Sequence, residues 1–227
     1  MEDHSLSVVT EKALPASKYL PDQMQKRLIL SATESENVIR FIYTYSPDAA
    51  IYTVNHYLVK PGVTVVDGPE DYDLQFYEEL TGKVNSPASA TPGTVFGAEF
   101  NETITVAQNP TAEGYTWDSG SMTLSAAIKE DNSTTLDFFY TRIECEYRVL
   151  YIDKDTGAEL GRETGMKAQY GQTVTETAKS FDGYMVDEEN KSIVMQAGSA
   201  AANTITFYYT RKTGDIQISK TANIPMP

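Results

Sequence analysis

A short turn segment with acidic side chains at alternate positions is the first candidate for chemistry in this sequence. Asp153, Asp155 and Gly157 match the beginning of a calcium-binding loop. Thr164 replaces the glutamate that closes such a loop at its twelfth position, so a hairpin turn is the simpler interpretation. A second acidic cluster, within residues 70–79, is interpreted as a solvated loop, with adventitious calcium as the alternative. We therefore predict no metal site and no cofactor.

Residues that could act as acids, bases or nucleophiles are few and scattered. The two histidines, His4 and His56, are far apart in the sequence, and His56 falls within an expected strand. The single cysteine, Cys145, has no neighbouring histidine and begins a strand, which favours a half-buried structural thiol. Catalysis requires several convergent groups in one pocket. We therefore predict that the protein is not an enzyme.

Aromatic side chains are the remaining candidates, because they can stack on the faces of sugars. Tyr115 and Tyr184 occupy equivalent places in a repeated pattern, which is more typical of core residues. Trp117 departs from that pattern, since Pro21 and Val186 stand at the matching positions. We keep Trp117 and Tyr115 as possible glycan contacts, with packing against a loop or core as the alternative.

Composition excludes several classes of function. The 32 acidic and 18 basic side chains give a net charge of −14, which repels a nucleic-acid backbone. No apolar run reaches the roughly 18–20 residues needed to cross a bilayer, so we expect no membrane insertion. The first 20 residues lack the pattern of a signal peptide, and we expect an internal fragment. A lone cysteine cannot form an intramolecular disulfide.

One pattern recurs three times: a tyrosine, an aliphatic residue nine positions later, and a run of aromatic and β-branched residues. The copies are Tyr19, Leu28 and residues 41–44; Tyr115, Leu124 and residues 138–141; and Tyr184, Ile193 and residues 207–210. Such self-similarity indicates that one small structural unit is repeated along the chain.

The third copy predicts short strands. Tyr147, Val149 and Tyr151 alternate with other residues, and a turn at residues 153–157 closes a hairpin. The return strand is expected at residues 159 to about 163, and further strands are expected at residues 192–195 and 204–210. Any helix should be a turn or two at most, within residues 173–180. The 15 tyrosines also favour strands, so the fold class is expected to be mainly β, with α+β as the alternative.

The repeats predict four segments. A first repeat at residues 1–45 has only the back half of the unit, and a second repeat at 51–142 carries a long insertion at 59–94. A third repeat occupies 143–212, and residues 213–227 begin a further domain. Within the second repeat, Tyr52, Val54 and His56 stand where Tyr147, Val149 and Tyr151 stand in the third. Exposed aromatics in the insertion would favour binding, and a polar loop would favour a spacer.

Residues 147–157, 183–184 and 205–210 together resemble the mucin-binding-protein (MucBP) repeat of Gram-positive surface adhesins. The resemblance implies a small β-grasp or ubiquitin-like sheet per repeat, an elongated array, and an extracellular, cell-wall-attached setting. Some members of this family contact mucin glycoproteins, so the resemblance also implies mucin as a partner. Residues 214–221 resemble the first strand of Cna-B-type domains, in which a lysine forms an isopeptide bond. Lys220 is the matching lysine, with an exposed lysine at a frayed end as the alternative.

These observations lead to one expected function and one alternative. We expect a non-enzymatic repeat region of a bacterial cell-surface adhesin that acts as a stalk or spacer, with neighbouring repeats in cis as its contacts. The alternative is a module that binds mucin or host glycans and gains avidity from its repeats.

Overall fold

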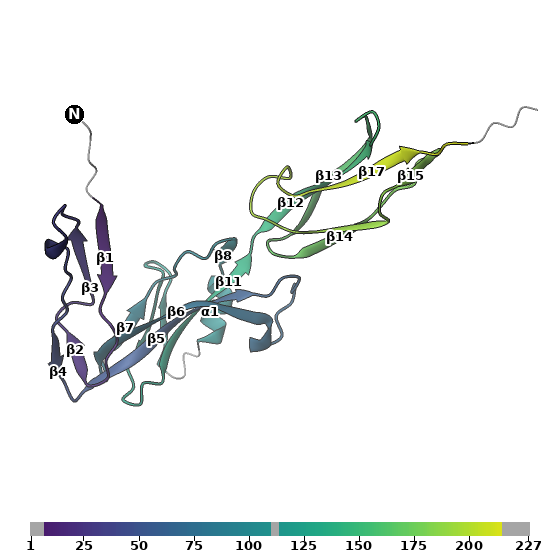
Figure 1. The fold of residues 1–227 in the computed structure, drawn as a ribbon. Coiled ribbons are helices and arrows are strands. Elements are labelled where there is room, and N and C mark those ends of the chain that lie inside the picture. Colours follow the sequence, from purple (N-terminus) through teal and green to yellow (C-terminus); the bar gives the residue numbers. More distant parts are fainter. Residues whose placement is uncertain (1–6, 110–113, 215–227) are drawn as a thin grey trace, which may run out of the picture. The chain divides into compact units, whose positions relative to one another are not determined.

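The computed structural model describes residues 7–109 and 114–214 and is mainly β, as expected (Figure 1). It divides into two compact units, Met1–Arg142 (unit 1) and Ile143–Pro227 (unit 2), which we describe separately. Among the described residues, α1 (Glu102–Gln108) is the single α-helix, accompanied by the 3₁₀ turns η1 (Glu34–Glu36) and η2 (Pro69–Asp71). No helix in these ranges is long and apolar enough to cross a membrane.

Unit 2 contains a four-stranded sheet and a separate two-stranded sheet. The four-stranded sheet has the order β13-β12-β17-β15, with β12 (Glu144–Asp153), β13 (Glu159–Gln169), β15 (Tyr184–Val186) and β17 (Thr204–Arg211). The second sheet pairs β14 (Thr173–Thr177) with β16 (Asn190–Val194). The sequence allowed at most a turn or two of helix within residues 173–180, and β14 occupies most of that stretch instead.

The first and last strands of unit 2 lie side by side at the centre of the sheet. β12 pairs in parallel with β17, from Arg148 opposite Thr204 to Asp153 opposite Tyr209. Strand alternation then directs one face of both strands into the core. The fully or nearly fully buried members of this core are Cys145, Tyr147, Val149, Tyr151, Met195, Ile205, Phe207 and Tyr209.

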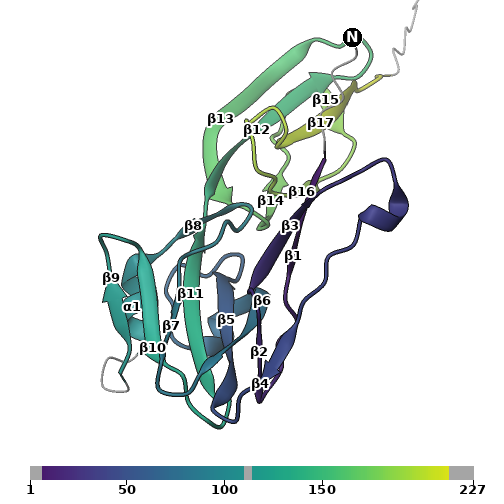
Figure 2. The same cartoon turned by 90° about the vertical axis from the view of Figure 1, so that its left-hand side faces the viewer.

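The larger part of unit 1, from Ala49 onward, repeats this arrangement with additions. One sheet has the order β6-β5-β11-β8, with β5 (Ala49–Val59), β6 (Tyr72–Lys83), β8 (Ala98–Phe100) and β11 (Thr134–Arg142). The other has the order β7-β10-β9, with β7 (Pro87–Ala90), β9 (Thr116–Asp118) and β10 (Thr123–Ala127). Figure 2 shows β5 and β11 running alongside each other.

Strand register confirms the match between the two units that the sequence predicted. β5 pairs in parallel with β11, and Phe138 lies opposite His56 as Phe207 lies opposite Tyr151. His56 therefore occupies the place of Tyr151. Alternate residues of β5 and β11 form a buried core, listed here by strand: Tyr52, Val54 and Leu58, then Leu136, Phe138 and Tyr140.

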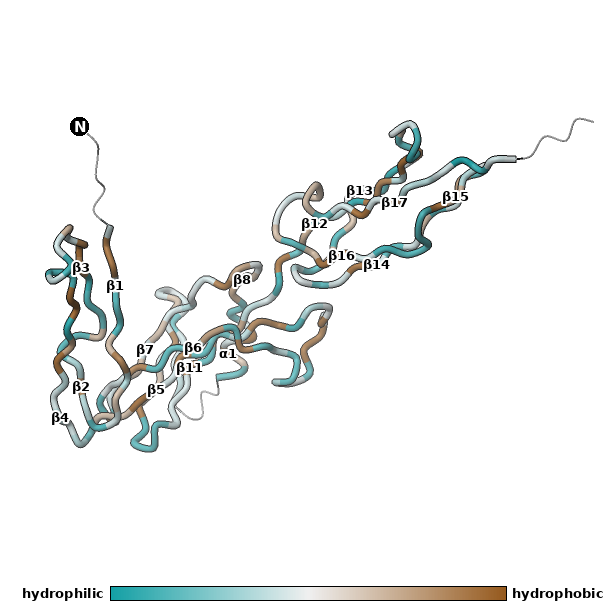
Figure 3. Tube along the Cα trace, in the orientation of Figure 1, coloured by the Kyte–Doolittle hydropathy of each residue, from teal (hydrophilic) through white to brown (hydrophobic). Residues whose placement is uncertain are grey.

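The first 45 residues of unit 1 form two small two-stranded sheets. β1 (Val8–Lys12) pairs with β3 (Gln25–Ile29), and β2 (Tyr19–Pro21) pairs with β4 (Tyr43–Tyr45). Several large apolar side chains here are exposed, including Ile29 and Ile42, and Figure 3 shows hydrophobic stretches along β1 and β3. Phe41 is half-buried, although Phe138 and Phe207 are fully buried at the matching place. The division of the chain into repeats remains a prediction.

The free edge of the last strand is covered differently in the two units. In unit 2, β15 pairs with β17, and Tyr184 lies opposite Arg211. In unit 1, β8 takes this place, and Ala98 lies opposite Arg142. The expected equivalence of Tyr115 and Tyr184 is therefore wrong. Tyr115 precedes β9, which belongs to the other sheet.

A clasp of one aspartate and one lysine follows β15 in unit 2. Asp187 accepts hydrogen bonds from the amides of Glu188 and Tyr208, and Lys191 donates to the Thr206 carbonyl. Lys191 also pairs with Asp187 at 2.6 Å. In the first 45 residues of unit 1, Asp22 and Lys26 form the same pattern on the Ile42 amide and the Arg40 carbonyl.

In the larger part of unit 1, from Ala49 onward, α1 replaces this clasp. Thr105 Oγ1 accepts a hydrogen bond from the Phe139 amide, and Asn109 forms hydrogen bonds with both the amide and the carbonyl of Asp137. The helix begins at Asn101, whose side chain accepts a hydrogen bond from the Ile104 amide. Because α1 and β9 have no counterpart in unit 2, we propose that the extra length is not confined to residues 59–94.

Candidate functional site

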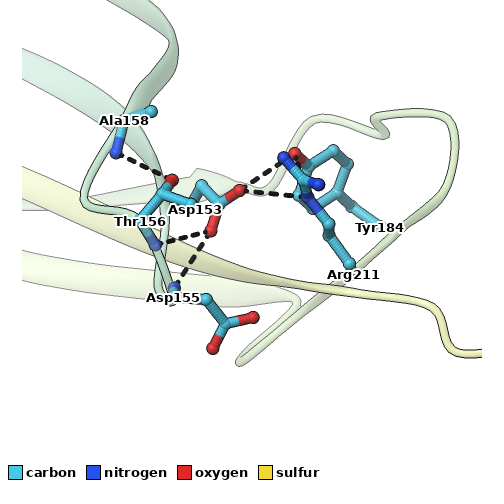
Figure 4. Close-up of polar contacts among 6 residues, drawn as sticks. All are labelled: Asp153, Asp155, Thr156, Ala158, Tyr184 and Arg211. Atoms are coloured by element: carbon cyan, nitrogen blue, oxygen red, sulfur yellow. Dashed lines mark hydrogen bonds and ion pairs between the residues drawn. The ribbon is translucent and has the colours of Figure 1, made fainter.

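The acidic turn of unit 2 is built around one buried carboxylate (Figure 4). Asp153 is 1% exposed, and its Oδ1 accepts hydrogen bonds from the amides of Asp155 and Thr156. Its Oδ2 accepts a hydrogen bond of 3.0 Å from the Tyr184 hydroxyl and lies 3.5 Å from Arg211 Nε. Both carboxylate oxygens are therefore occupied by protein groups. This arrangement fixes the hairpin turn and ties β15 to β12.

The electrostatics of Asp153 follow from these contacts. Burial by itself raises the pKa of this carboxyl group, but hydrogen bonds from the Thr156 amide and the Tyr184 hydroxyl outweigh burial, and the pKa lies below its usual value. Asp153 is therefore ionised at neutral pH. In unit 1 the matching position is Leu58, opposite Tyr140, so no acid is available there to hold a tyrosine.

A groove of about 330 Å³ lies over the middle of β5 and β6 in unit 1. Its walls combine side chains of the two strands with the segment that follows β7. The lining residues are Val54, His56, Phe76, Glu78, Leu80 and residues 89–93. This groove, called the His56 groove below, includes part of the predicted insertion.

His56 is 3% exposed and held in one tautomer by a chain of hydrogen bonds. The Tyr140 hydroxyl donates to the Gly93 carbonyl at 2.9 Å, so it must accept the 2.9 Å bond from His56 Nδ1. The proton therefore resides on Nδ1, and Nε2 is left as an acceptor. Burial lowers the pKa of His56, which keeps the ring neutral at neutral pH.

Phe76 gives the His56 groove an aromatic surface. Its ring stacks on His56 with the ring centroids 4.1 Å apart, and the side chain is 38% exposed. Glu78, another lining residue, forms an ion pair with Lys12 of β1. A stacking surface beside a neutral imidazole acceptor and a carboxylate suits a ligand that has an apolar face and hydroxyl donors.

The two aromatics chosen from the sequence lie elsewhere in unit 1. Trp117 on β9 is half-buried, and its ring packs 5.6 Å from that of Phe100. Its indole nitrogen donates to Glu102 Oε1 at 2.8 Å. Tyr115 is half-buried against the same core. A role for Trp117 and Tyr115 in glycan contact therefore stays a proposal.

The remaining candidates from the sequence are the cysteine, possible metal ligands, Lys220 and His4. Cys145 is buried at 3% exposure, and burial raises the pKa of its thiol. Among the described residues, no group of three or more His, Cys, Asp or Glu side chains is placed to hold a metal ion. Lys220 and His4 lie outside the described residues.

Comparison with known proteins finds a family match within unit 2. Residues 148–210 match the model of the MucBP domain family. These residues therefore form a MucBP domain, which confirms the resemblance for this part of the chain. Over 199 residues the chain is 27% identical to internalin J of Listeria monocytogenes serotype 4b (strain F2365). The alignment covers 86% of this chain and 19% of internalin J, so the chain spans about a fifth of that relative's length.

Two solved structures are similar at low sequence identity. The type 2 repeat of the mucus binding protein MUB from Lactobacillus reuteri is 11% identical, with 72% of this chain and 100% of that chain covered and a TM-score of 0.23. The Bacillus anthracis TIE protein is 12% identical, with 92% and 42% covered and a TM-score of 0.31.

Proposed function

We propose that this chain is a non-catalytic, extracellular repeat segment of a bacterial cell-surface protein and that its repeats bear mechanical load as a stalk. The MucBP domain at residues 148–210 supports the surface setting, because MucBP domains are a non-catalytic family found in surface mucus-binding proteins. The duplicated Asp22 and Asp187 clasps support descent from one repeated unit.

The observation that carries the proposal is the pairing of the first and last strands of each complete repeat. β5 and β11 are adjacent and parallel, as are β12 and β17. The start of the first strand and the end of the last strand therefore lie at opposite ends of the pair. Force applied through the chain loads the inter-strand hydrogen bonds together, in shear, instead of one after another. Such a sheet resists extension, as a stalk requires.

Single-molecule force spectroscopy on the full chain tests this proposal in unit 2. Cys145→Ser removes the native thiol, and pairs of new cysteines then serve as handles. Handles at Glu144→Cys and Lys212→Cys pull β12 and β17 in shear, whereas handles at Asp155→Cys and Lys212→Cys peel the same strands from one end. We expect a severalfold higher unfolding force in the shear geometry. Equal forces in the two geometries would refute the proposed mechanical role.

A second candidate function is recognition of mucin or host glycans, and the His56 groove is the observation that favours it. The partly exposed Phe76 ring and the free acceptor of His56 are suited to the apolar face and hydroxyl groups of a sugar. Repeated modules in one surface protein would add avidity to weak binding at each.

Immobilised mucin and a glycan array separate the two functions. A spacer gives no saturable signal, whereas a binding module gives a signal that Phe76→Ala abolishes if the His56 groove is the site. Trp117→Ala tests the β9 surface in the same way. Tyr208→Ala in unit 2 serves as the control, because Tyr208 is exposed to a similar extent as Phe76.

A further inference from the structure

A second hollow lies on the opposite face of the central sheet of unit 1. It measures about 190 Å³ and is lined by Tyr57, Pro69, Tyr72, Gln108, Asp137 and Phe139. The strands supply Tyr57, Tyr72, Asp137 and Phe139, while Pro69 belongs to η2 and Gln108 to α1. These two helical segments have no counterpart in unit 2. The hollow, called the Asp137 pocket below, is therefore a feature of the second repeat.

Tyr72, a lining residue of the Asp137 pocket, has an unsatisfied hydroxyl group. Tyr72 is 7% exposed, and among the buried side-chain nitrogen and oxygen atoms of the described residues its Oη alone has no hydrogen-bond partner. An unpaired buried hydroxyl group is costly and requires an explanation. A polar group of a ligand in the pocket would satisfy it.

Asp137 gives the pocket a negative charge without an internal counterion. Its carboxylate accepts a 2.7 Å hydrogen bond from Asn55 Nδ2 and a 3.4 Å bond from Thr135 Oγ1. No lysine, arginine or histidine in residues 7–109 and 114–214 forms an ion pair with it. Burial raises the pKa of Asp137, which the two hydrogen bonds oppose. A bound cation would compensate for this burial.

In unit 2 a lysine lies over the aromatic ring that corresponds to Phe139. Tyr208 follows the buried Phe207, as Phe139 follows the buried Phe138. The ammonium group of Lys191 lies 5.4 Å from the centroid of the Tyr208 ring. Where Leu124 is aligned with Ile193, Met122 stands in place of Lys191. In the described part of the chain, no cation therefore lies over the Phe139 ring.

We propose that the Asp137 pocket binds a primary ammonium group carried on an aliphatic stem, as in a lysine side chain or a small alkylamine. The ammonium donates to the Asp137 carboxylate and to Tyr72 Oη, and the stem packs on Phe139 and Tyr57. A hollow that holds benzene measures about 150 Å³, so this pocket has room for a stem of a few carbons. Aromatic walls add cation–π attraction. This site is separate from the mechanical role and does not depend on it.

Calorimetric or NMR titration of the full chain with n-butylammonium and with Nα-acetyl-lysine methylamide tests the proposal. We expect saturable binding of both, with a Kd of about millimolar for so few atoms. The neutral isostere n-butanol should bind at least tenfold more weakly, because it carries no positive charge and its single O–H can donate to only one of Asp137 and Tyr72. A lower Kd for Nα-acetyl-lysine methylamide than for n-butylammonium would assign a lysine side chain of a polypeptide as the ligand, and equal Kd values would show that a free amine suffices.

Two variants and one control make the titration decisive. Asp137→Asn should weaken ammonium binding by roughly tenfold or more, and Tyr72→Phe severalfold. Tyr72→Phe removes no hydrogen bond of the free protein, so it tests the site even if Asp137→Asn folds poorly. Asp131→Asn, at an exposed aspartate outside the pocket, should leave binding unchanged. Absence of saturable binding, equal binding of n-butanol, or equal losses in Asp131→Asn and Asp137→Asn would overturn the proposal.

Discussion

Replacing Phe207 by alanine should destabilise unit 2 and leave unit 1 unchanged. Phe207 is fully buried, and its ring packs 5.9 Å from that of Tyr151. Truncation of a buried phenylalanine costs about 3–5 kcal/mol. With a denaturant slope of about 1–3 kcal/mol per molar urea, the unfolding midpoint of unit 2 should fall by about 2 M. Each unit has its own buried cluster, so the loss should not spread.

The chain contains a built-in reporter for this experiment. Trp117 is the single tryptophan and lies in unit 1, so its fluorescence follows unit 1 alone, whereas circular dichroism follows the strands of both units. Phe207→Ala should shift part of the dichroism transition and none of the fluorescence transition. Phe138→Ala, at the matching place in unit 1, should shift the fluorescence transition. A shift of Trp117 fluorescence by Phe207→Ala would refute the separation of the two cores.

Three further outcomes are expected. Tyr72→Phe should leave unit 1 as stable as before or raise its unfolding free energy by up to ~1 kcal/mol in urea titrations, since its hydroxyl has no partner. Gly157→Ala should lower the thermal midpoint of unit 2, at a cost of about 1 kcal/mol, because Gly157 has a φ of +71°, and Gly157→Asn should cost less. The stability of unit 1 should fall as pH drops below about 6.5, because burial lowers the pKa of His56 and the unfolded chain binds the proton more readily. His56→Gln should remove this part of the slope in Trp117-monitored unfolding.

The strands of the repeats were predictable because buried and exposed side chains alternate every second residue along a strand, a pattern visible over a few positions. Tyr147, Val149 and Tyr151 share one face in the sequence pattern, and all three are buried in unit 2. The same alternation located the matching residues of β5. Local patterns of this kind depend on neighbouring residues alone, so they survive changes elsewhere in the chain.

Two features depend on tertiary contacts and were not predictable. α1 contains threonine and valine, which favour strands, yet it is held at the edge of β11 by Thr105 and Asn109. Tyr115 keeps the spacing of Tyr184, but β8 already covers the strand edge that Tyr184's strand covers in unit 2. Sequence spacing alone does not determine which strand pairs with the free edge of β11 or of β17.

The candidate sites show a similar limit. Phe76 lies on β6, and the side of the sheet that it faces depends on a register shift between His56 and Tyr57 in the pairing of β5 with β6. Trp117 was conspicuous in the sequence, yet its indole nitrogen is bound to Glu102. The exposure of Phe76 and the unpaired hydroxyl group of Tyr72 depend on tertiary packing, which the local sequence pattern does not determine.

Force spectroscopy of the full chain, held at its two ends, tests the load-bearing role most directly. We expect two separate high-force unfolding events, one from the β5–β11 pair and one from the β12–β17 pair, and Phe207→Ala should lower the force of one event only. Gradual extension without such events would contradict the role of this chain as a stalk.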